Sequence, residues 1–297
     1  MTELKALIRR NNKLFLRDKG VFFTSLITPM ILLILYVSFL RNVYADAFTS
    51  VLSAFGFAVE EKVMDGLVAG QLLSSLLAVC CVTVAFCSNM VMVTDKVTGA
   101  IGDIMISPVK AWKVAVAYYV SCFISTLSVC LTAMGIGFIY MASAGWYLSI
   151  SDVVLLLCDT VLLTLFGVAL SSLINFFLST QGQISAVGSI VSSCYGFISG
   201  AYMPISQFSE GLQTVISFLP GTYGTVLMRY HSMRGALSEM QASGVPEDVI
   251  KELTASVDAS ICFFENQVSY GAMYAAIGVS IAILMAVYIL LNKLKRK

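Results

Sequence analysis

The sequence offers few side chains at the spacings that enzymatic chemistry requires. It contains no G-x-x-x-x-G-K-[ST] phosphate loop, no His-Glu-x-x-His and no Gly-x-Ser-x-Gly. His231 is the only histidine, so a site with several histidine ligands is excluded. We therefore expect that the chain is not an enzyme and that it has no catalytic residue, no metal ligand and no cofactor of its own.

The eight cysteines do not indicate a zinc site, because no Cys-x-x-Cys pair occurs among them. All of them except Cys262 lie inside apolar runs. A free cysteine in such a run behaves as a small buried hydrophobic residue, and we interpret these cysteines in that way.

Asp159 is the ionisable residue that stands inside an apolar run, and such a residue at membrane depth marks a functional site. Two interpretations remain open. Asp159 lines a transport pathway or a subunit interface, or it has only a local role in packing. A proton relay would need a chain of such groups, and the apolar runs supply none. Asp152, at the mouth of the same run, is interpreted as the helix N-cap.

The elements that must position these residues are membrane helices. Hydrophobic residues make up 58% of the 297 residues and charged residues only 12%, against about 25% charged in soluble domains. A helix that crosses the bilayer needs roughly 20 apolar residues. The sequence predicts an all-α membrane protein in which residues 1–297 form a single transmembrane domain. Its six predicted spans are residues 21–40, 67–94, 114–144, 153–174, 184–202 and 269–291.

Residues 204–268 form the long connection before the last span. Within it, residues 211–228 carry no charge over 18 positions and could be counted as a seventh span. Pro220 and Gly221 interrupt this stretch in its middle, and proline removes a backbone donor and clashes with the preceding turn. We therefore predict two half-helices that form a re-entrant hairpin.

The distribution of charge predicts the orientation. Most of the 18 lysines and arginines lie in the N-terminal tail, in residues 95–113 and in the C-terminal residues 293–297. By the positive-inside rule these segments face the cytoplasm. A seventh span would place residues 293–297 outside. We expect a multi-pass protein of a bacterial plasma membrane with both termini in the cytoplasm.

Residues 1–19 have a basic amphipathic pattern, with Leu4, Leu7 and Ile8 at helical spacing beside Arg9 and Arg10. The pattern predicts an interfacial helix whose cations meet anionic lipid headgroups. Its role is either that of a positive tail that sets orientation or that of a brace for a cytoplasmic partner.

The loop that follows the second span predicts a short helix. Ile101 and Ile104 supply an apolar face, and Ser107-Pro108 ends the helix, because a residue before proline avoids the α region. This element is either an ordinary loop helix or one that transmits a push from a cytoplasmic machine.

Residues 238–268 form a polar insertion on the outside. Pro246 followed by two acids predicts a helix N-terminus, and Val249, Leu253 and Val257 mark one apolar face. The insertion is either an acidic cap over an extracellular gate or a solvated surface, and we expect the solvated surface.

Two motifs and the order of the elements resemble the membrane subunits of type-2 ATP-binding cassette (ABC) exporters. The loop Asp95-Lys-Val-Thr-Gly99 followed by Ile106-Ser-Pro108 is similar to the coupling-helix pattern of that family. Ser199-Gly-Ala-Tyr-Met-Pro204, then Leu219-Pro220-Gly-Thr-Tyr223 and Arg229, is similar to its Gly-x-x-x-Pro and Pro-x-x-Tyr steps. Two features depart from the family pattern: Thr94-Asp95-Lys96 replaces the usual Glu-Arg-Glu, and the insertion at residues 238–268 is longer.

The resemblance implies a permease subunit that works with a separate cytoplasmic ABC ATPase, which holds the ATP and the magnesium ion. It also implies a second permease copy or homologue, contact with membrane lipids and no nucleic acid. The substrate would be amphipathic or lipid-like: a drug, a peptide antibiotic, a lipid or a glycan-lipid. The residues implied to couple to the ATPase are Asp95, Gly99, Ile104, Ser107 and Pro108, and those implied at the gate are Gly200, Pro204, Pro220, Tyr223 and Arg229.

Two other classes of protein remain open. An ion-coupled secondary transporter or channel would need several buried ionisable groups or an inverted repeat. A membrane scaffold that does not transport would need neither.

Overall fold

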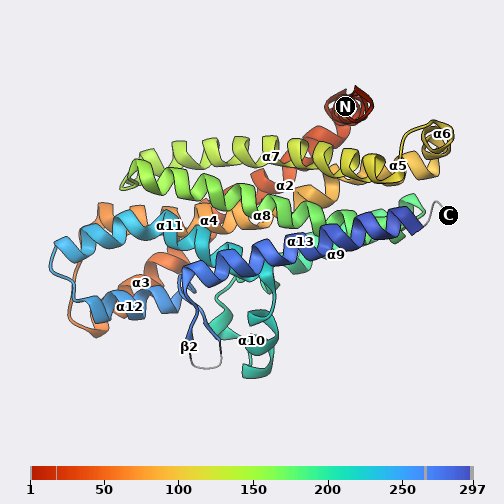
Figure 1. The fold of residues 1–297 in the computed structure, drawn as a ribbon. Coiled ribbons are helices and arrows are strands. Elements are labelled where there is room, and N and C mark those ends of the chain that lie inside the picture. The colour runs from red at the N-terminus through yellow and green to blue at the C-terminus, as the bar shows by residue number, and fades with distance from the viewer. Residues whose placement is uncertain (1, 18, 264–265, 295–297) are drawn as a thin grey trace.

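The computed structural model describes residues 2–17, 19–263 and 266–294 and is almost entirely helical (Figure 1). Within these residues the strands are β1 (Cys262–Phe263) and β2 (Asn266–Gln267), which pair as one short hairpin. The expected all-α class is confirmed. Met1 and Asp18 of the predicted interfacial helix, and residues 295–297 of the basic tail, lie outside the described residues.

Among the residues that the structure describes, five helical stretches are long and apolar enough to cross a membrane. Each of them overlaps a predicted span. The fifth predicted span, residues 184–202, corresponds to helix α9 (Gln181–Ile198), which is not among the five. The five stretches are Met30–Ala54, Glu61–Val97, Ala111–Ala144, Ile150–Phe177 and Tyr270–Leu294.

The first helix is longer than predicted. It begins as α2 (Lys19–Leu35), passes through a π-helical turn, η1 (Tyr36–Leu40), and continues as α3 (Arg41–Ala54). The predicted span ends at Leu40, but the helix continues past it, because Arg41 ends the apolar run without ending the helix. The Arg41 guanidinium instead binds the Asp65 carboxylate at 2.6 Å.

Helix α4 (Glu61–Ser88) forms the centre of the bundle and is buried along almost its whole length. Because it is buried on all sides, other helices enclose it. It packs against α7 (Ala111–Ala144), α8 (Ile150–Phe177) and α11 (Pro220–Ala242). The last span, α13 (Tyr270–Leu294), packs against α8 and α11.

The start of α8 corrects one detail of the sequence analysis. Ser149 is the N-cap, and Asp152 is the third residue of the helix. The Ser149 hydroxyl accepts from the Asp152 backbone, and the Asp152 carboxylate accepts from the Ser149 backbone, which forms a capping box. Asp152 also pairs with Arg234 at 2.6 Å.

The predicted interruption of the helix before the last span is present, and it falls at Pro220. The turn η2 (Ile205–Gln207) and the short helix α10 (Glu210–Ser217) precede it, and α11 begins at Pro220, where a proline suits the first helical turn. The expected second half-helix continues past Met228 to Ala242. It therefore runs into the predicted polar insertion at 238–268, and that insertion begins as helix.

The break lies beside the middle of α8. A Cβ on Gly221 would lie 3.4 Å from the Phe166 ring, and a Cβ on Gly224 would lie 2.6 Å from the Leu163 side chain. Further along α11, Arg234 reaches Asp152 at the start of α8. Helix α11 therefore begins halfway along α8 and runs antiparallel to it.

Helix α12 (Glu247–Ser256) follows Pro246 as predicted, and the predicted apolar face, Val249, Leu253 and Val257, is buried. The expectation of a solvated insertion is wrong for Asp258, which is only 6% exposed.

The two ends of the bundle carry different elements (Figure 1). Helix α1 (Thr2–Arg17), helix α6 (Ala100–Ile106) and the described end of α13 lie at one end. Helices α3 and α12 lie at the opposite end and contact each other. Helix α5 (Met90–Val97) joins α4 to α6.

Candidate functional site

Asp95 in α5 faces inward and ties α1 to the bundle. Its side chain is 6% exposed. Arg10 Nη1 donates to Asp95 Oδ2 at 2.6 Å, and Arg10 Nη2 donates to Asp95 Oδ1 at 2.8 Å. The Tyr118 hydroxyl of α7 donates to Oδ2 at 2.5 Å. Bidentate, charge-assisted pairs of this kind are the strong ones. The carboxylate is therefore used within its own chain, where it joins α1, α5 and α7.

Lys96, the next residue, joins α5 to the end of α8. Its ammonium donates to the carbonyl oxygens of Asn175, Phe176 and Leu178 at 2.8, 2.8 and 2.9 Å. The last carbonyls of a helix lack partners inside the helix, and a cation there also favours the negative end of the helix dipole. Lys96 therefore caps α8.

Helix α6 projects from this junction. Gly99 begins it with a positive φ of 78°, a conformation that glycine adopts without strain. Ser107 ends the helix in an extended conformation before Pro108, as predicted. Ile104 is half-buried against the cluster that contains Tyr118, whereas Ile106 is 87% exposed. The helix therefore has one face on the bundle and a bare apolar tip.

Arg229 in α11 lies at the centre of a second cluster. The side chain is 1% exposed. Its Nη2 donates to the Gly200 carbonyl oxygen at 2.8 Å and to Ser75 Oγ of α4 at 3.3 Å. Its Nη1 donates to the Val257 carbonyl oxygen at 2.5 Å. One buried cation therefore holds together the loop after α9, helix α4 and the segment after α12.

Asp258 completes this cluster. Its Oδ2 lies 3.7 Å from Arg229 Nη1 and accepts from the Ile205 backbone N–H, directly after Pro204, at 2.5 Å. Burial raises the pKa of the Asp258 carboxyl, while Arg229 and the Ile205 N–H act in the opposite direction. Asp258 therefore fixes the Pro204 turn to the segment after α12.

The remaining predicted gate residues connect α10 to α11. The Tyr223 hydroxyl donates to the Ser217 carbonyl oxygen at 2.5 Å, and Thr222 Oγ1 donates to the Ile216 carbonyl oxygen at 3.2 Å. Pro220 lies between these contacts at the first position of α11. The structure thus gathers the predicted gate residues around the junction of α9, α10 and α11.

Asp159 lies in a third cluster, between α8, α11 and α13. Its carboxylate is 0% exposed, contacts His231 Nδ1 at 2.6 Å through Oδ2 and accepts from the Tyr274 hydroxyl at 2.5 Å through Oδ1. Tyr230 stacks on Tyr270 beside it, with ring centroids 4.2 Å apart. The sequence analysis found no chain of ionisable groups around Asp159, yet His231 lies next to it.

Several residues of these clusters were missed. Tyr118, Tyr274 and Asp258 each bind a buried charge from a distant segment, and a single sequence does not contain that pairing. His231 carried the one available signal, since it is the only histidine. Among the described residues, no group of three or more His, Cys, Asp or Glu side chains could hold a metal ion.

The apolar helices and the segment broken before the last of them define the class: a multi-pass helical membrane protein. The family model described as ABC-2 type transporter matches residues 2–231, which is most of the 297-residue chain. The chain therefore belongs to the ABC-2 type transporter family of membrane (permease) subunits, which generally work with a partner ATPase. No curated protein matches the chain at a significant level.

Proposed function

We propose that this permease forms the translocation path of an exporter for an amphipathic or lipid-like substrate. It is not itself an enzyme, and a separate ATPase subunit supplies the work of ATP hydrolysis and holds the ATP and magnesium. Family membership supports the role of permease subunit. The direction of transport and the substrate class are our inference.

The observation that carries this proposal is the way α6 is attached. Its tip presents Ile106, 87% exposed, while the preceding helix α5 is fastened by Asp95 to α1 and by Lys96 to α8. The exposed apolar end of α6 can bind a partner protein, and the hydrogen bonds of α5 allow a force applied there to reach the bundle. A push on α6 would reach both α1 and α8 through adjacent residues of α5.

The proposed topology follows from the two ends of the bundle. The end with α1 and α6 faces the cytoplasm, and the end with α3 and α12 faces outward. Helix α9 is the remaining span, the fifth in chain order, and its packing against α4 supports this. The break at Pro220, beside Phe166 in the middle of α8, supports a re-entrant segment, because irregular backbone at this depth is tolerated only where protein covers it.

The proposed mechanism uses the Arg229 cluster as the outer gate. Arg229 ties the loop at Gly200, helix α4 and the segment at Val257 together in the closed state. Closure of the ATPases would push α6, and the movement of α4 and α9 would separate these attachments. Two permeases, identical or related, would face each other across the path.

The test compares two isoleucines of equal exposure at opposite ends of the bundle. Ile106 is 87% exposed and Ile150 is 86% exposed, so Ile106→Asp and Ile150→Asp disturb the fold to the same small extent. The permease is purified with its ATPase and reconstituted into liposomes. We expect Ile106→Asp to abolish co-purification and substrate-stimulated ATP hydrolysis and Ile150→Asp to leave both intact. Intact coupling in Ile106→Asp would contradict the role of α6.

One observation favours a second candidate function, an ion-coupled transporter. Asp159 and His231 form a buried pair of ionisable groups, with Tyr274 on the same carboxylate. Such groups inside a membrane are used in proton relays. Transport by liposomes that contain the permease alone, driven by a pH gradient and without nucleotide, would favour this candidate over the exporter. Absence of substrate movement in both assays would favour a scaffold.

A further inference from the structure

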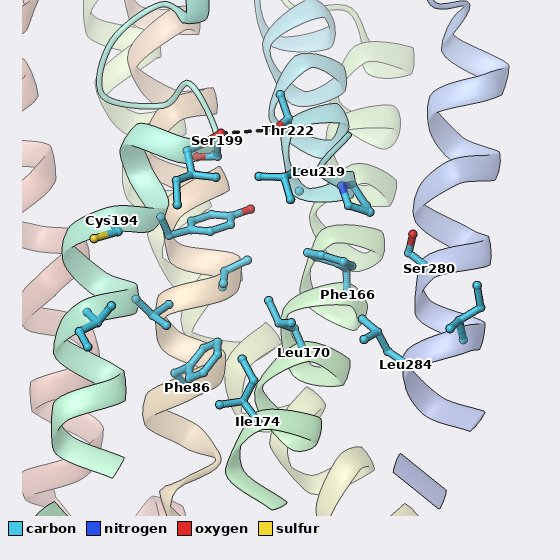
Figure 2. A pocket seen from close by; sticks show the side chains of 18 residues that line it. Phe86, Phe166, Leu170, Ile174, Cys194, Ser199, Leu219, Thr222, Ser280 and Leu284 are labelled. Carbon is cyan, nitrogen blue, oxygen red and sulfur yellow. Dashed lines mark hydrogen bonds between the residues drawn. The ribbon is translucent and has the colours of Figure 1, made fainter. Parts of the chain in front are cut away.

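Two cavities of the described chain differ in the charge of their walls. The cavity between α9 and α13, of about 500 Å³, is apolar, and no charged side chain of the described residues lines it (Figure 2). The hydroxyls of Tyr195 and Ser199 are buried in its wall. A cavity of about 780 Å³ lies at the end of the bundle that carries α1 and α6, and three of its lining residues are cations. This charged cavity therefore has groups that can select a ligand, and its volume is within the about 300–1,000 Å³ typical of small-molecule sites.

The charged cavity lies between the corner where α1 meets α2 and the segment formed by α5 and α6. Arg17 and Lys19 line it from the corner, and Thr94 lines it from α5. Leu14 and Phe15 of α1 add an apolar wall. One ligand in this cavity would therefore contact both the corner and α5, and it would meet a charged side and an apolar side.

The cations at the corner are not neutralised by the described residues. Asp95 is the acid that lines the cavity among these residues, and Arg10 binds both of its oxygens. Arg17 and Lys19 are exposed and form no ion pair with a described residue. Asp18, which separates them in the sequence, lies outside the described residues. The described wall therefore has two cations in excess, Arg17 and Lys19.

The charged cavity lies at the depth of the lipid headgroups. In Figure 1, α1 is seen along its axis whereas α7 lies in the plane of the picture, so α1 crosses the direction of the spans and runs along the membrane surface. Lys19 directly precedes the apolar run that starts at Val21, and a lysine near the end of a span reaches to the interface. Leu14 and Leu16 are 43% and 60% exposed, which suits contact with acyl chains. A lipid can therefore place its phosphate at the corner and its first methylenes along the apolar wall.

We propose that this cavity binds the headgroup of an anionic phospholipid from the leaflet that meets α1. The Arg17 guanidinium and the Lys19 ammonium bind the phosphate oxygens, and such charge-assisted hydrogen bonds are strong. The Thr94 hydroxyl, which has no hydrogen-bond partner among the described residues, donates to the headgroup from the other side. The amphipathic pattern of α1 predicts only a general attraction to anionic headgroups. The cavity adds a site that a single lipid occupies, where it joins the α1–α2 corner to α5.

The test is photo-crosslinking of the full chain in nanodiscs of phosphatidylcholine. The probe is phosphatidylglycerol with a diazirine close to the ester of one acyl chain, and crosslinked peptides are mapped by mass spectrometry. We expect labelling in residues 14–17 and 91–98, and an excess of unlabelled phosphatidylglycerol should remove it. Arg17→Gln combined with Lys19→Gln should reduce the labelling of residues 91–98 about 25-fold, since each cation near an anionic surface contributes about fivefold.

The matched control is Lys5→Gln combined with Lys13→Gln. It removes two cations from exposed positions of α1 that lie outside the charged cavity. The general attraction of α1 to anionic lipid falls by a similar amount in both double variants. We therefore expect the control to leave most of the labelling of residues 91–98 in place.

Thr94→Trp tests the shape of the cavity at constant charge. The ring fills the cavity from the α5 side, so the labelling of residues 14–17 should be lost. Val97→Trp adds the same ring to a position of α5 that is 51% exposed and outside the cavity, and it should leave this labelling unchanged.

Equal labelling by a phosphatidylcholine probe, or labelling that survives Arg17→Gln combined with Lys19→Gln, would overturn the proposal. Displacement of the probe by glycerol 3-phosphate would also overturn it and assign the cavity to a soluble phosphate. Unchanged labelling together with loss of ATPase co-purification in that double variant would assign the cavity to the ATPase instead. The labelling needs neither nucleotide nor the ATPase, so its failure leaves the exporter function untouched.

Discussion

The guanidinium of Arg10 binds both carboxylate oxygens of Asp95, a residue 85 positions further along the chain. This contact fastens an amphipathic helix to the bundle through a nearly buried carboxylate. Helix α1 is therefore held by a specific ion pair as well as by its apolar face. Movement of α5 would carry α1 with it.

Arg10→Ala should weaken both the fold and the coupling to the ATPase. It leaves the Asp95 carboxylate with Tyr118 as its remaining partner among the hydrogen bonds described above. We expect a loss of about 1.5–3 kcal/mol in unfolding free energy, the range for a hydrogen bond to a charged group. Urea denaturation in detergent measures it. Arg9→Ala, at the exposed neighbouring position, is the control and should have little effect.

Lys96→Met should destabilise the end of α8. The substitution keeps the length of the side chain but leaves the carbonyls of Asn175, Phe176 and Leu178 without this cation. We expect faster amide hydrogen exchange in the last turn of α8 and a loss of about 1–3 kcal/mol. Lys110→Met, at an exposed position before α7, is the matched control. Equal exchange in the two variants would show that Lys96 does not cap α8.

Arg229→Met should be the most destabilising of these variants. Loss of the guanidinium leaves Asp258 without its buried cation and the Gly200 and Val257 carbonyls without this donor. Removal of one partner of a buried pair costs about 3–5 kcal/mol. Thermal unfolding followed by fluorescence-detected gel filtration measures the effect. Arg234→Met removes a pair whose arginine is 38% exposed and whose Asp152 is 3% exposed, and it should cost less than Arg229→Met because water reaches the arginine.

Asp159→Leu and Tyr274→Phe should be coupled. Both remove the same hydrogen bond between α8 and α13, so the double variant should lose less stability than the sum of the single variants. We expect a coupling energy of about 0.5–3 kcal/mol in a double-mutant cycle. The cycle is repeated with Tyr140→Phe, on α7, in place of Tyr274→Phe. Additive effects in the Tyr274 cycle would mean that the bond contributes nothing.

Much of the fold could be predicted because the membrane imposes it. Apolar runs without charges located the helices at Glu61–Val97, Ala111–Ala144, Ile150–Phe177 and Tyr270–Leu294. Helix ends were harder, because a charge ends an apolar run without ending the helix. Arg41 continues the first helix to Ala54, and Ser149 instead of Asp152 caps α8.

The candidate site was less predictable, because its residues are paired across long separations. The motifs located Asp95, Gly200 and Arg229, but periodicity does not show which direction a charged side chain faces. Asp95 faces inward to Arg10, whereas the sequence suggested a surface for a partner. Asp258 belongs to an acidic insertion, yet it is buried because Arg229 and the Ile205 N–H lie beside it.

The uninterrupted helix from Lys19 to Ala54 has a mechanical consequence. At 1.5 Å per residue it is about 54 Å long. The whole bilayer measures about 40–45 Å with its headgroups. A helix of this length contacts α1 through α2 and contacts α12 through α3. A displacement of α1 would therefore be transmitted to α12 unless the helix bends. The π turn at Tyr36–Leu40 is an irregular point along this helix, and bending there would reduce the displacement that reaches α12.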